Sequence, residues 1–229
     1  MDEPGSRRGR PHDAEGARAA ILNAAEQVFA EHGFDGARVD AIAETAGYNK
    51  SLIFQYYGDK LGLYAAVLRR TDEETRVLQA QLLAPLLADE TIASDAHRFR
   101  SFLKIAIGAF FDFLVEHPRL MRMIIWEQAE GWQTFAKILS QLDTEDLDLF
   151  RTIFSRVQGA GLLRSDFDPA IQLVVAEQIC WSHLTWIPLY QMILPGEDFS
   201  SNAALARARE YIVDFLVAGM MVDPKATKR

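Results

Sequence analysis

The residue types that most often carry catalysis or hold metals are sparse in this sequence. Its 229 residues include five histidines and one cysteine, Cys180. The sequence contains no H-E-x-x-H, G-x-S-x-G, G-x-G-x-x-G or phosphate-binding glycine motif, and His97, Glu127 and His183 lack the spacing of metal ligands. We therefore predict a protein with no catalytic residue, no metal site and no cofactor.

Recognition of nucleic acid is a different chemistry, and residues 43–60, AETAGYNKSLIFQYYGDK, carry side chains suited to it. Lysine can bond guanine, asparagine or glutamine can bond adenine, and cations neutralise phosphates. Among the aromatic residues of the stretch, Tyr57 is expected in the core, while Phe54 could be core or surface. The aromatic side chains are expected to fix a short helix whose outward face stays polar.

Apolar residues repeat at helical spacing around this stretch. The pattern over 21–29 predicts one helix, which the sequence EHGFDG ends. A shorter pattern over 39–46 predicts a second helix, closed by Gly47 in a left-handed conformation. Asn49 is a suitable N-cap for a third helix over 50–57. Two short helices joined in this way have helix-turn-helix geometry, although a purely structural helical hairpin fits the pattern too.

The remainder of the sequence is also helical in pattern. Asp59 can cap a longer helix that starts at Lys60, and long apolar-periodic segments follow it. Prolines fall at or near the breaks between these segments: Pro85, Pro118, Pro169, Pro188 and Pro195. Alternating segments with hairpin dipeptides, which would indicate a sheet, are absent. We predict an all-α fold with about nine or ten helices.

Composition and charge bound the class of protein. A hydrophobic content of 49% is sufficient for a core, and no apolar run reaches the roughly 18 residues of a membrane span. The net charge is −8, but residues 1–70 hold 9 basic and 10 acidic residues, against 15 and 22 in residues 71–229. This uneven distribution is compatible with two functions on one chain. The lone cysteine and an N-terminal segment without an apolar core favour the cytoplasm.

The segment GARVDAIAETAGYNKSLIFQYYGDKLGLYAAVL resembles the N-terminal DNA-binding domain of the tetracycline-repressor (TetR) family of bacterial regulators. Domains of this family combine an Ile-Ala helix, a small residue and glycine in a turn, a recognition helix that ends in an aromatic tetrad, and a lysine that opens the fourth helix. The corresponding residues here are Ile42 and Ala43, Ala46 and Gly47, residues 54–57, and Lys60. Two residues depart from the usual pattern of the family: Phe54 stands where tyrosine is usual, and Tyr57 stands where phenylalanine is usual.

The resemblance implies a helix-turn-helix over residues 38–57 and a set of contacts with double-stranded DNA. Positions that match backbone contacts of the family are Arg38, Lys50, Tyr56 and Lys60. Base reading is implied for the exposed first turns of the third helix, which are Tyr48, Asn49, Lys50 and Ser51, with Gln55 at the margin.

The resemblance also implies an order of domains. A DNA-binding domain is expected over 15–75, a ligand-binding and dimerisation domain over 76–222, and a disordered tail over 223–229. Residues 1–14 are expected to form a flexible basic arm. Its arginines could follow the DNA backbone or reach a minor groove, or could simply solubilise the chain. These arginines are Arg7, Arg8 and Arg10.

The region after residue 75 is rich in aromatic and Met side chains, which suit the lining of an adaptable apolar pocket. Because any helical core has a similar composition, packing is the favoured role for each residue taken singly, while a subset of them is expected to frame a cavity. The candidates for a ligand site are Phe102, Phe110, Met123, Trp126, Glu127, Phe135, Trp181, His183 and Trp186. Glu127 and His183 are the preferred polar contacts because a buried polar group needs a partner.

Two long apolar-faced segments, about 168–190 and 202–221, match the helices that form the dimer interface in the family. A homodimer would place two recognition helices about 34–36 Å apart, which implies an approximately palindromic operator. We therefore predict a transcriptional regulator, specifically a repressor that a small, largely apolar effector releases from DNA. The alternatives are a transcriptional activator and a helical partner-binding protein; an enzyme is not expected.

Overall fold

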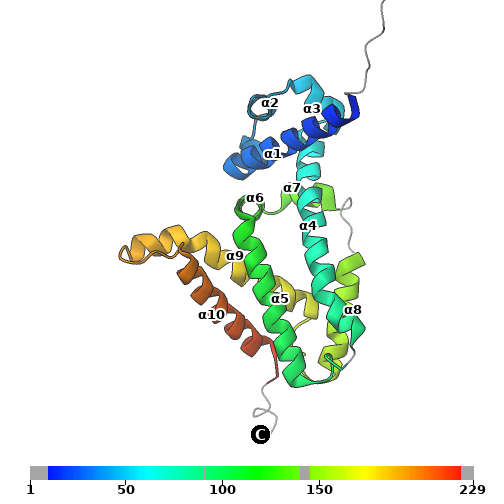
Figure 1. The fold of residues 1–229 in the computed structure, drawn as a ribbon, viewed down its shortest axis with the longest axis vertical. Helices are drawn as coiled ribbons and strands as arrows, with labels where there is room; N and C mark the ends of the chain where they lie inside the picture. Colours follow the sequence, from blue (N-terminus) through cyan, green and yellow to red (C-terminus); the bar gives the residue numbers. More distant parts are fainter. Residues whose placement is uncertain (1–9, 90, 140–144, 223–229) are drawn as a thin grey trace, which may run out of the picture. The chain divides into compact units, whose positions relative to one another are not determined.

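The computed structural model describes residues 10–89, 91–139 and 145–222, and this part of the chain forms ten α-helices (Figure 1). In chain order they are α1 (Arg10–Gly36), α2 (Val39–Ala46), α3 (Lys50–Tyr57), α4 (Lys60–Ala88), α5 (Ala96–Glu116), α6 (Pro118–Ala129), α7 (Gln133–Ile138), α8 (Glu145–Gly159), α9 (Pro169–Ile193) and α10 (Asn202–Met220). The predicted all-α fold is confirmed. Helix α1 already begins at Arg10, inside the predicted arm, while Arg7, Arg8 and the predicted tail lie outside the described residues.

The described residues group into two compact units. Within the described residues, the first unit comprises 10–73 together with 122–139, and the second comprises 74–89, 91–121 and 145–222. Helices α4 and α6 each contribute residues to both units. The sequence predicted a first domain that ends at residue 75, and it did not indicate that α7 and most of α6 group with this domain.

The core of the first unit is built from the apolar faces of α1 to α4. Fully buried side chains come from all four helices: Ile21, Phe29, Ile42, Ile53 and Leu63. They follow the helical spacing read from the sequence, so each helix buries one face and exposes the other. Met123 of α6 and Ile138 of α7 join the same core.

Helix α1 is interrupted at Gly33, where α6 packs against it. Gly33 has φ 68° and ψ −179°, and a Cβ atom there would lie 2.9 Å from Cδ2 of Trp126. Glycine alone combines this conformation with such a close neighbour. The indole Nε1 of Trp126 and Nε of Arg122 both donate to the carbonyl oxygen of Ala30, at 3.3 and 3.2 Å. These bonds attach α6 to the end of α1.

The second unit has its own core, formed mainly by α5, α8, α9 and α10. Its most buried residues include Phe99, Phe111, Val157, Cys180 and Val217. The end of α10 is tied to the connection between α8 and α9, because the N–H of Arg164 donates to Met220 O and the N–H of Val222 donates to Leu162 O, both at 3.0 Å. Among the described helices, none combines the length and apolar character that crossing a membrane requires.

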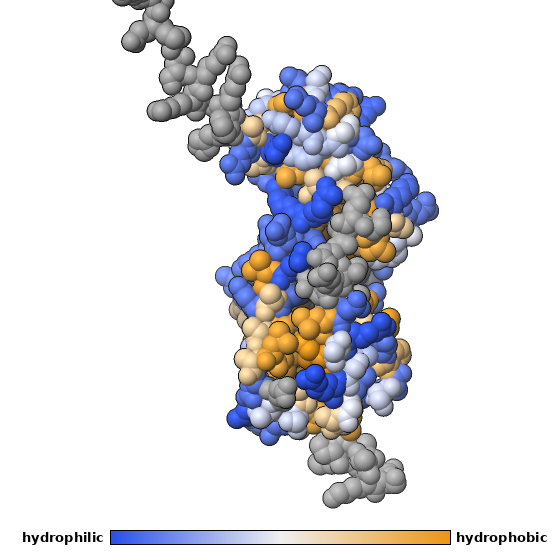
Figure 2. Space-filling model, turned by 90° about the vertical axis from the view of Figure 1, so that its right-hand side faces the viewer, coloured by the Kyte–Doolittle hydropathy of each residue, from blue (hydrophilic) through white to orange (hydrophobic). Residues whose placement is uncertain are grey.

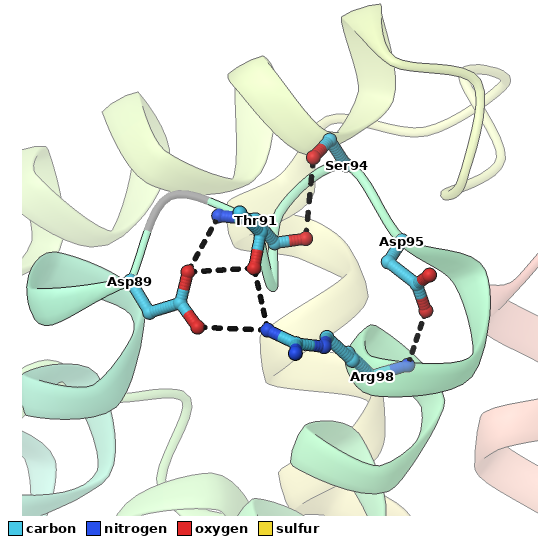
Figure 3. A network of polar contacts seen from close by, with 5 residues as sticks. All are labelled: Asp89, Thr91, Ser94, Asp95 and Arg98. Carbon is cyan, nitrogen blue, oxygen red and sulfur yellow. Dashed lines mark hydrogen bonds and ion pairs between the residues drawn. The ribbon is translucent and has the colours of Figure 1, made fainter.

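A polar network fixes the connection between α4 and α5 (Figure 3). Oδ1 of Asp89 accepts hydrogen bonds from both the N–H and the hydroxyl of Thr91, and Nη1 of Arg98 donates to Asp89 Oδ2 and to Thr91 Oγ1. Asp95 caps α5 by accepting the N–H of Arg98 at 2.8 Å. Such local hydrogen bonds satisfy backbone groups that a helix start leaves unpaired.

One face of the molecule shows how polar and apolar residues are distributed on it (Figure 2). On the face shown in Figure 2, hydrophilic residues predominate and apolar residues gather in patches between them. The second unit exposes large apolar side chains on α9 and α10, such as Trp186 at 53% and Phe215 at 56%. Exposed apolar side chains that cluster on one element indicate a surface that binds a partner.

Candidate functional site

The turn between α2 and α3 has the predicted geometry. Gly47 ends α2 with φ 73° and ψ 22°, a left-handed conformation, and its N–H bonds the last carbonyls of that helix. Two residues later, Oδ1 of Asn49 accepts the N–H of Leu52 at 2.8 Å and caps α3. Gly58, with φ 78°, ends α3. Both bounds of α3 therefore agree with the sequence prediction, because each is set by a local signal.

Helix α3 is amphipathic, with one buried face and one polar face. Ile53 is fully buried, and Leu52, Tyr56 and Tyr57 pack partly against the core of the first unit. The exposed residues are Asn49, Lys50, Ser51, Phe54 and Gln55. The helix thus presents hydrogen-bonding side chains outward while its opposite face anchors it. An α-helix with an exposed polar face of this kind fits the major groove of DNA.

Tyr57 and Phe54, two aromatic residues of α3, have different environments. Tyr57 is half-buried, and its hydroxyl donates to the carbonyl oxygen of Arg18 in α1 at 3.3 Å. Burial raises the pKa of Tyr57. Phe54 is 38% exposed and lies outside the core. Tyr57 therefore holds α3 against α1, whereas Phe54 forms part of the outward surface.

Both predicted phosphate-binding lysines, Lys50 and Lys60, already have partners within the first unit. Nζ of Lys50 forms an ion pair with Oδ2 of Asp40 on α2 at 3.0 Å and lies 5.8 Å from the ring centroid of Phe54. Nζ of Lys60 donates to the carbonyl oxygen of Asp35 at 3.2 Å and lies 4.6 Å from the ring centroid of Phe34. Lys60 thereby connects the start of α4 to the end of α1.

The other predicted DNA contacts lie around the same helix-turn-helix. Arg38 is exposed and occupies the N-cap position of α2, where its side chain makes no capping bond. Tyr48 lies in the turn and is half-buried against the core, and Tyr56 is half-buried in the last turn of α3. The structure places one of the eight predicted contacts just before α2 and the other seven in the turn after α2, on α3 or at the start of α4. Their binding of DNA remains a prediction.

One cation in this region was not predicted from the sequence. The guanidinium carbon of Arg18, on α1, lies 4.8 Å from the ring centroid of Tyr56. The signal for it is faint: Arg18 is the one long side chain in the stretch GARAA. Its proximity to α3 depends on how α1 packs against the end of α3, which no local pattern reveals.

The predicted ligand residues divide between the two units. Met123, Trp126, Glu127 and Phe135 belong to the first unit, and the others belong to the second: Phe102, Phe110, Trp181, His183 and Trp186. Glu127 is 3% exposed, and both of its carboxylate oxygens are bonded. Oε1 accepts the hydroxyl of Tyr64 at 2.8 Å and Oε2 accepts the N–H of Phe135 at 3.0 Å.

The second unit contains an aromatic and ionisable cluster on α5 and α9. The ring centroid of His183 lies 6.5 Å from that of Phe111 and 5.4 Å from that of Tyr190. Burial lowers the pKa of His183 and raises the pKa of Glu177 to about 7. Both shifts disfavour charge, so this part of α9 is an apolar environment that contains hydrogen-bonding groups.

A pocket of about 390 Å³ lies elsewhere in the second unit, between α5 and α10. It is lined by Lys104, Ala206, Arg209, Glu210, Val213 and Asp214, and it shares no residue with the predicted ligand set. Its cations are paired, since Lys104 contacts Asp214 at 2.7 Å and Arg209 contacts Asp112 at 2.8 Å. Across the described residues, no group of three or more His, Cys, Asp or Glu side chains could hold a metal ion.

Comparison with known protein families gives one match near the N-terminus and one in the C-terminal half of the chain. Residues 21–67 match the family "Bacterial regulatory proteins, tetR family", and residues 101–216 match "Tetracyclin repressor-like, C-terminal domain". The first match includes α2, α3 and the turn between them. The second match includes most of α5, all of α9 and most of α10.

Individual relatives agree with these families. The HTH-type transcriptional repressor SCO4008 of Streptomyces coelicolor is 36% identical over 118 residues, which are 52% of this chain and 53% of the relative. The HTH-type transcriptional activator FasR of Mycolicibacterium smegmatis is 34% identical over 123 residues, which are 54% of this chain and 51% of the relative. The matched segments therefore span about half the length of these two relatives.

The fold is shared over most of the chain with a solved structure. The ketosteroid transcriptional regulator KstR2 of Mycobacterium tuberculosis superposes with a TM-score of 0.61 over 90% of this chain and 95% of KstR2. Sequence identity in that comparison is 17%, so the likeness concerns the fold.

Proposed function

Since the chain belongs to the TetR family of transcriptional regulators, it is a DNA-binding regulator, and we propose that it represses transcription until a small, largely apolar effector binds. The observation that carries the proposal is the outward polar face of α3, anchored from behind by the buried Ile53. In this proposal, Asn49, Lys50, Ser51 and Gln55 contact base edges from the major groove. DNA as partner implies that the protein works in the cytoplasm.

A homodimer through α9 and α10 is part of the proposal. It is supported by the large apolar side chains that these helices expose, namely Ile171, Val174, Val175, Trp186, Leu189, Met192, Ile193, Tyr211 and Phe215. Covering them with a second copy would bury apolar area that is otherwise in water. Two-fold symmetry would then present two copies of α3 to successive major grooves and would require an approximately palindromic operator.

We propose the effector site in the second unit, beside the cluster on α5 and α9. The apolar rings of Phe110 and Phe111 would supply contact area, and His183 would supply a hydrogen bond. Helices α4 and α6 are the proposed levers, because each contains residues of both units. Tenfold weaker DNA binding requires a coupling free energy of only about 1.4 kcal/mol between the two sites.

Selection of bound fragments from a random duplex pool tests the DNA-binding part of the proposal. We expect the full chain to enrich an approximate palindrome, and we expect Gln55→Ala to weaken binding to that operator while leaving non-specific binding nearly unchanged. Gln81→Ala, an exposed glutamine on α4, is the matched control. Enrichment of no sequence, or equal effects of both variants on the operator, would contradict base reading by α3.

The sign of regulation needs a separate test, because SCO4008 is named a repressor and FasR an activator. A reporter gene placed behind the selected operator should be silenced by the protein and restored by an effector. Activation of the reporter by the protein would favour the alternative. Compounds that release the operator can be found by screening apolar molecules of about 15–30 heavy atoms, a size that fits pockets of typical volume.

The lever part of the proposal can be tested once such a compound is known. A disulfide crosslink that fixes the two DNA-binding units of a dimer at their operator-bound spacing should abolish release by the compound. Binding of the compound itself should persist. If the crosslinked dimer still releases the operator normally, the change in spacing is not the mechanism.

A further inference from the structure

Arg18 is an exposed cation held in a defined position by α3. Its guanidinium carbon lies 4.8 Å from the ring centroid of Tyr56, and its backbone carbonyl accepts the hydroxyl of Tyr57 at 3.3 Å. The two tyrosine rings are themselves in edge-to-face contact, with centroids 6.2 Å apart and an interplanar angle of 83°. The last turn of α3 therefore fixes both the main chain and the side chain of this arginine.

Comparison with Arg70 shows what is unusual about Arg18. Arg70 also approaches α1, but its guanidinium is satisfied there, with Nη1 donating to Asn23 Oδ1 at 2.7 Å and Nη2 paired with Glu26. The side chain of Arg18 forms no hydrogen bond or ion pair with any of the described residues, and it stacks on a ring instead. Stacking on a ring leaves the N–H donors at the edge of the guanidinium plane free.

A stacked guanidinium with free donors is well suited to phosphate. Arginine binds phosphate oxygens through paired N–H donors, and a ring beneath the guanidinium reduces the entropy lost when it binds. The neighbouring Tyr56 matches a position that contacts the DNA backbone in the TetR family. A phosphate that accepts the hydroxyl of Tyr56 would have a cation beside it.

We propose that Arg18 and Tyr56 together form a phosphate-binding site that positions α3 on DNA, with Arg18 as a positioning residue on α1 rather than a base-reading one. The proposal rests on the proposed DNA-binding function. It extends the contact surface beyond Arg38, the turn after α2, α3 and the start of α4 to the first half of α1. The alternative is that Arg18 only fastens α1 to α3, and the two roles have different experimental signatures.

The salt dependence of DNA binding separates these roles. Affinity for a random-sequence duplex and for the selected operator is measured from about 50 to 300 mM salt with the wild type, Arg18→Gln and Arg18→Lys. For Arg18→Gln we expect the slope of log K against log salt to become less steep by about one unit per subunit bound, with a similar loss on both duplexes. Arg18→Lys should restore the slope, because it keeps the charge.

Arg100→Gln supplies the control, since Arg100 is an exposed arginine on α5 in the second unit. This variant should leave both the slope and the affinity unchanged. A wild-type slope in the Arg18→Gln variant overturns the proposed site while leaving DNA binding by α3 intact. Absence of any salt-dependent binding by the wild type overturns the proposed function and this site with it.

A measurement on the unmodified protein covers the case in which Arg18→Gln does not fold. Phenylglyoxal modifies accessible guanidinium groups, and mass spectrometry of the digested protein reports the extent at each arginine. Saturating duplex should slow modification of Arg18 several-fold and leave Arg100 unaffected. Equal modification of Arg18 with and without duplex overturns the site, whatever the stability of the variants.

Discussion

At the scale of single residues, Lys50 forms an ion pair within the protein and is also a proposed contact with DNA. Its ammonium pairs with Asp40, yet the two side chains are 45% and 75% exposed. Exposed ion pairs of this kind contribute only about 0–1 kcal/mol to folding, so a phosphate or a guanine can replace the carboxylate at little cost. Asp40 holds Lys50 at the start of α3. If Lys50 contacts DNA as proposed, Asp40 would compete with DNA for it.

This competition predicts that Asp40→Asn strengthens DNA binding. Release of Lys50 from its partner should raise affinity for a duplex by up to about fivefold, the worth of an exposed ion pair. Titration of labelled duplex at about 100 mM salt measures the change. Glu44→Gln removes the same charge one turn further along α2, and it should have the smaller effect. If the two variants raise affinity equally, only overall charge matters and the pair has no specific role.

The residues of α3 show what can be read from sequence and what cannot. The cap at Asn49 and the left-handed Gly47 were predictable, because each is determined by its own chemistry and its immediate neighbours. The position of Arg18 beside α3 could not be predicted, because its contact with Tyr56 joins positions far apart in the sequence. The exposure of Phe54 was undecided for a related reason, since an aromatic residue at the edge of a helix face can pack either way.

At the scale of elements, a buried carboxylate joins α6 and α7 to α4. Glu127 accepts hydrogen bonds from Tyr64 on α4 and from the backbone of Phe135 on α7. Burial and the bond to Glu127 raise the pKa of Tyr64, so the phenol stays a donor. The sequence marked Glu127 as a ligand contact because a buried acid needs partners, and the structure supplies those partners from within the first unit.

Loss of one partner should therefore be costly. Tyr64→Phe leaves Oε1 of Glu127 buried without its donor, and we expect the free energy of unfolding to fall by about 1–3 kcal/mol. Urea denaturation measures this change. Gln81→Ala, at an exposed position on α4, is the control and should have little effect. The double variant Tyr64→Phe/Glu127→Gln should lose less than the sum of its single changes; strict additivity would contradict the direct coupling.

Glu177, on α9, is an ionisable group whose protonation depends on whether the protein is folded. Burial raises the pKa of Glu177 from 4.5 to about 7. Between these two values the native protein retains a proton that the unfolded chain has lost, so stability falls as pH rises from about 4.5 to 7 and is level above. Glu177→Gln removes this dependence, and at pH 8 it should be more stable than the wild type by on the order of 2 kcal/mol.

Thermal or urea unfolding at pH 5 and pH 8 checks the sign of this effect. The gain from Glu177→Gln should be small at pH 5 and larger at pH 8. Glu210→Gln, at an exposed position on α10, should show no such difference. A gain that is the same at both pH values would mean that Glu177 titrates normally in the folded protein.

The grouping of α6 and α7 with the first unit is the part of the fold that sequence patterns could not provide. Apolar spacing predicted that this part of the chain is helical, and α9 and α10 extend close to the predicted segments. The bounds of α6 and α7 were not predicted. Their grouping depends on contacts between distant positions, such as Trp126 against Gly33. A predicted boundary at residue 75 follows chain order, whereas the structure groups residues by packing.

At the scale of the whole molecule, the proposed dimer explains why α9 and α10 expose so much apolar surface. Phe215 is 56% exposed and Leu87, on α4, is 57% exposed. If α9 and α10 bind a second copy, a charge at position 215 should be far more disruptive than one at position 87, because only the former would be buried on association.

Sedimentation of the two variants tests this expectation. Phe215→Glu should shift the protein from dimer to monomer at micromolar concentration, while Leu87→Glu should remain dimeric. Operator binding should fall with dimerisation in the first variant and persist in the second. A dimeric Phe215→Glu variant, or a monomeric wild type, would place the association surface elsewhere or remove it.

The most direct test of the central claim is the affinity of the wild-type protein for the selected operator as a function of the spacing between its half-sites. Two copies of α3 in a symmetric dimer should require half-site centres about 10 base pairs apart or a multiple of this, so the account predicts that insertion of five base pairs reduces affinity to the non-specific level and insertion of ten restores part of it. Affinity that does not depend on spacing would contradict paired recognition of the major groove by α3.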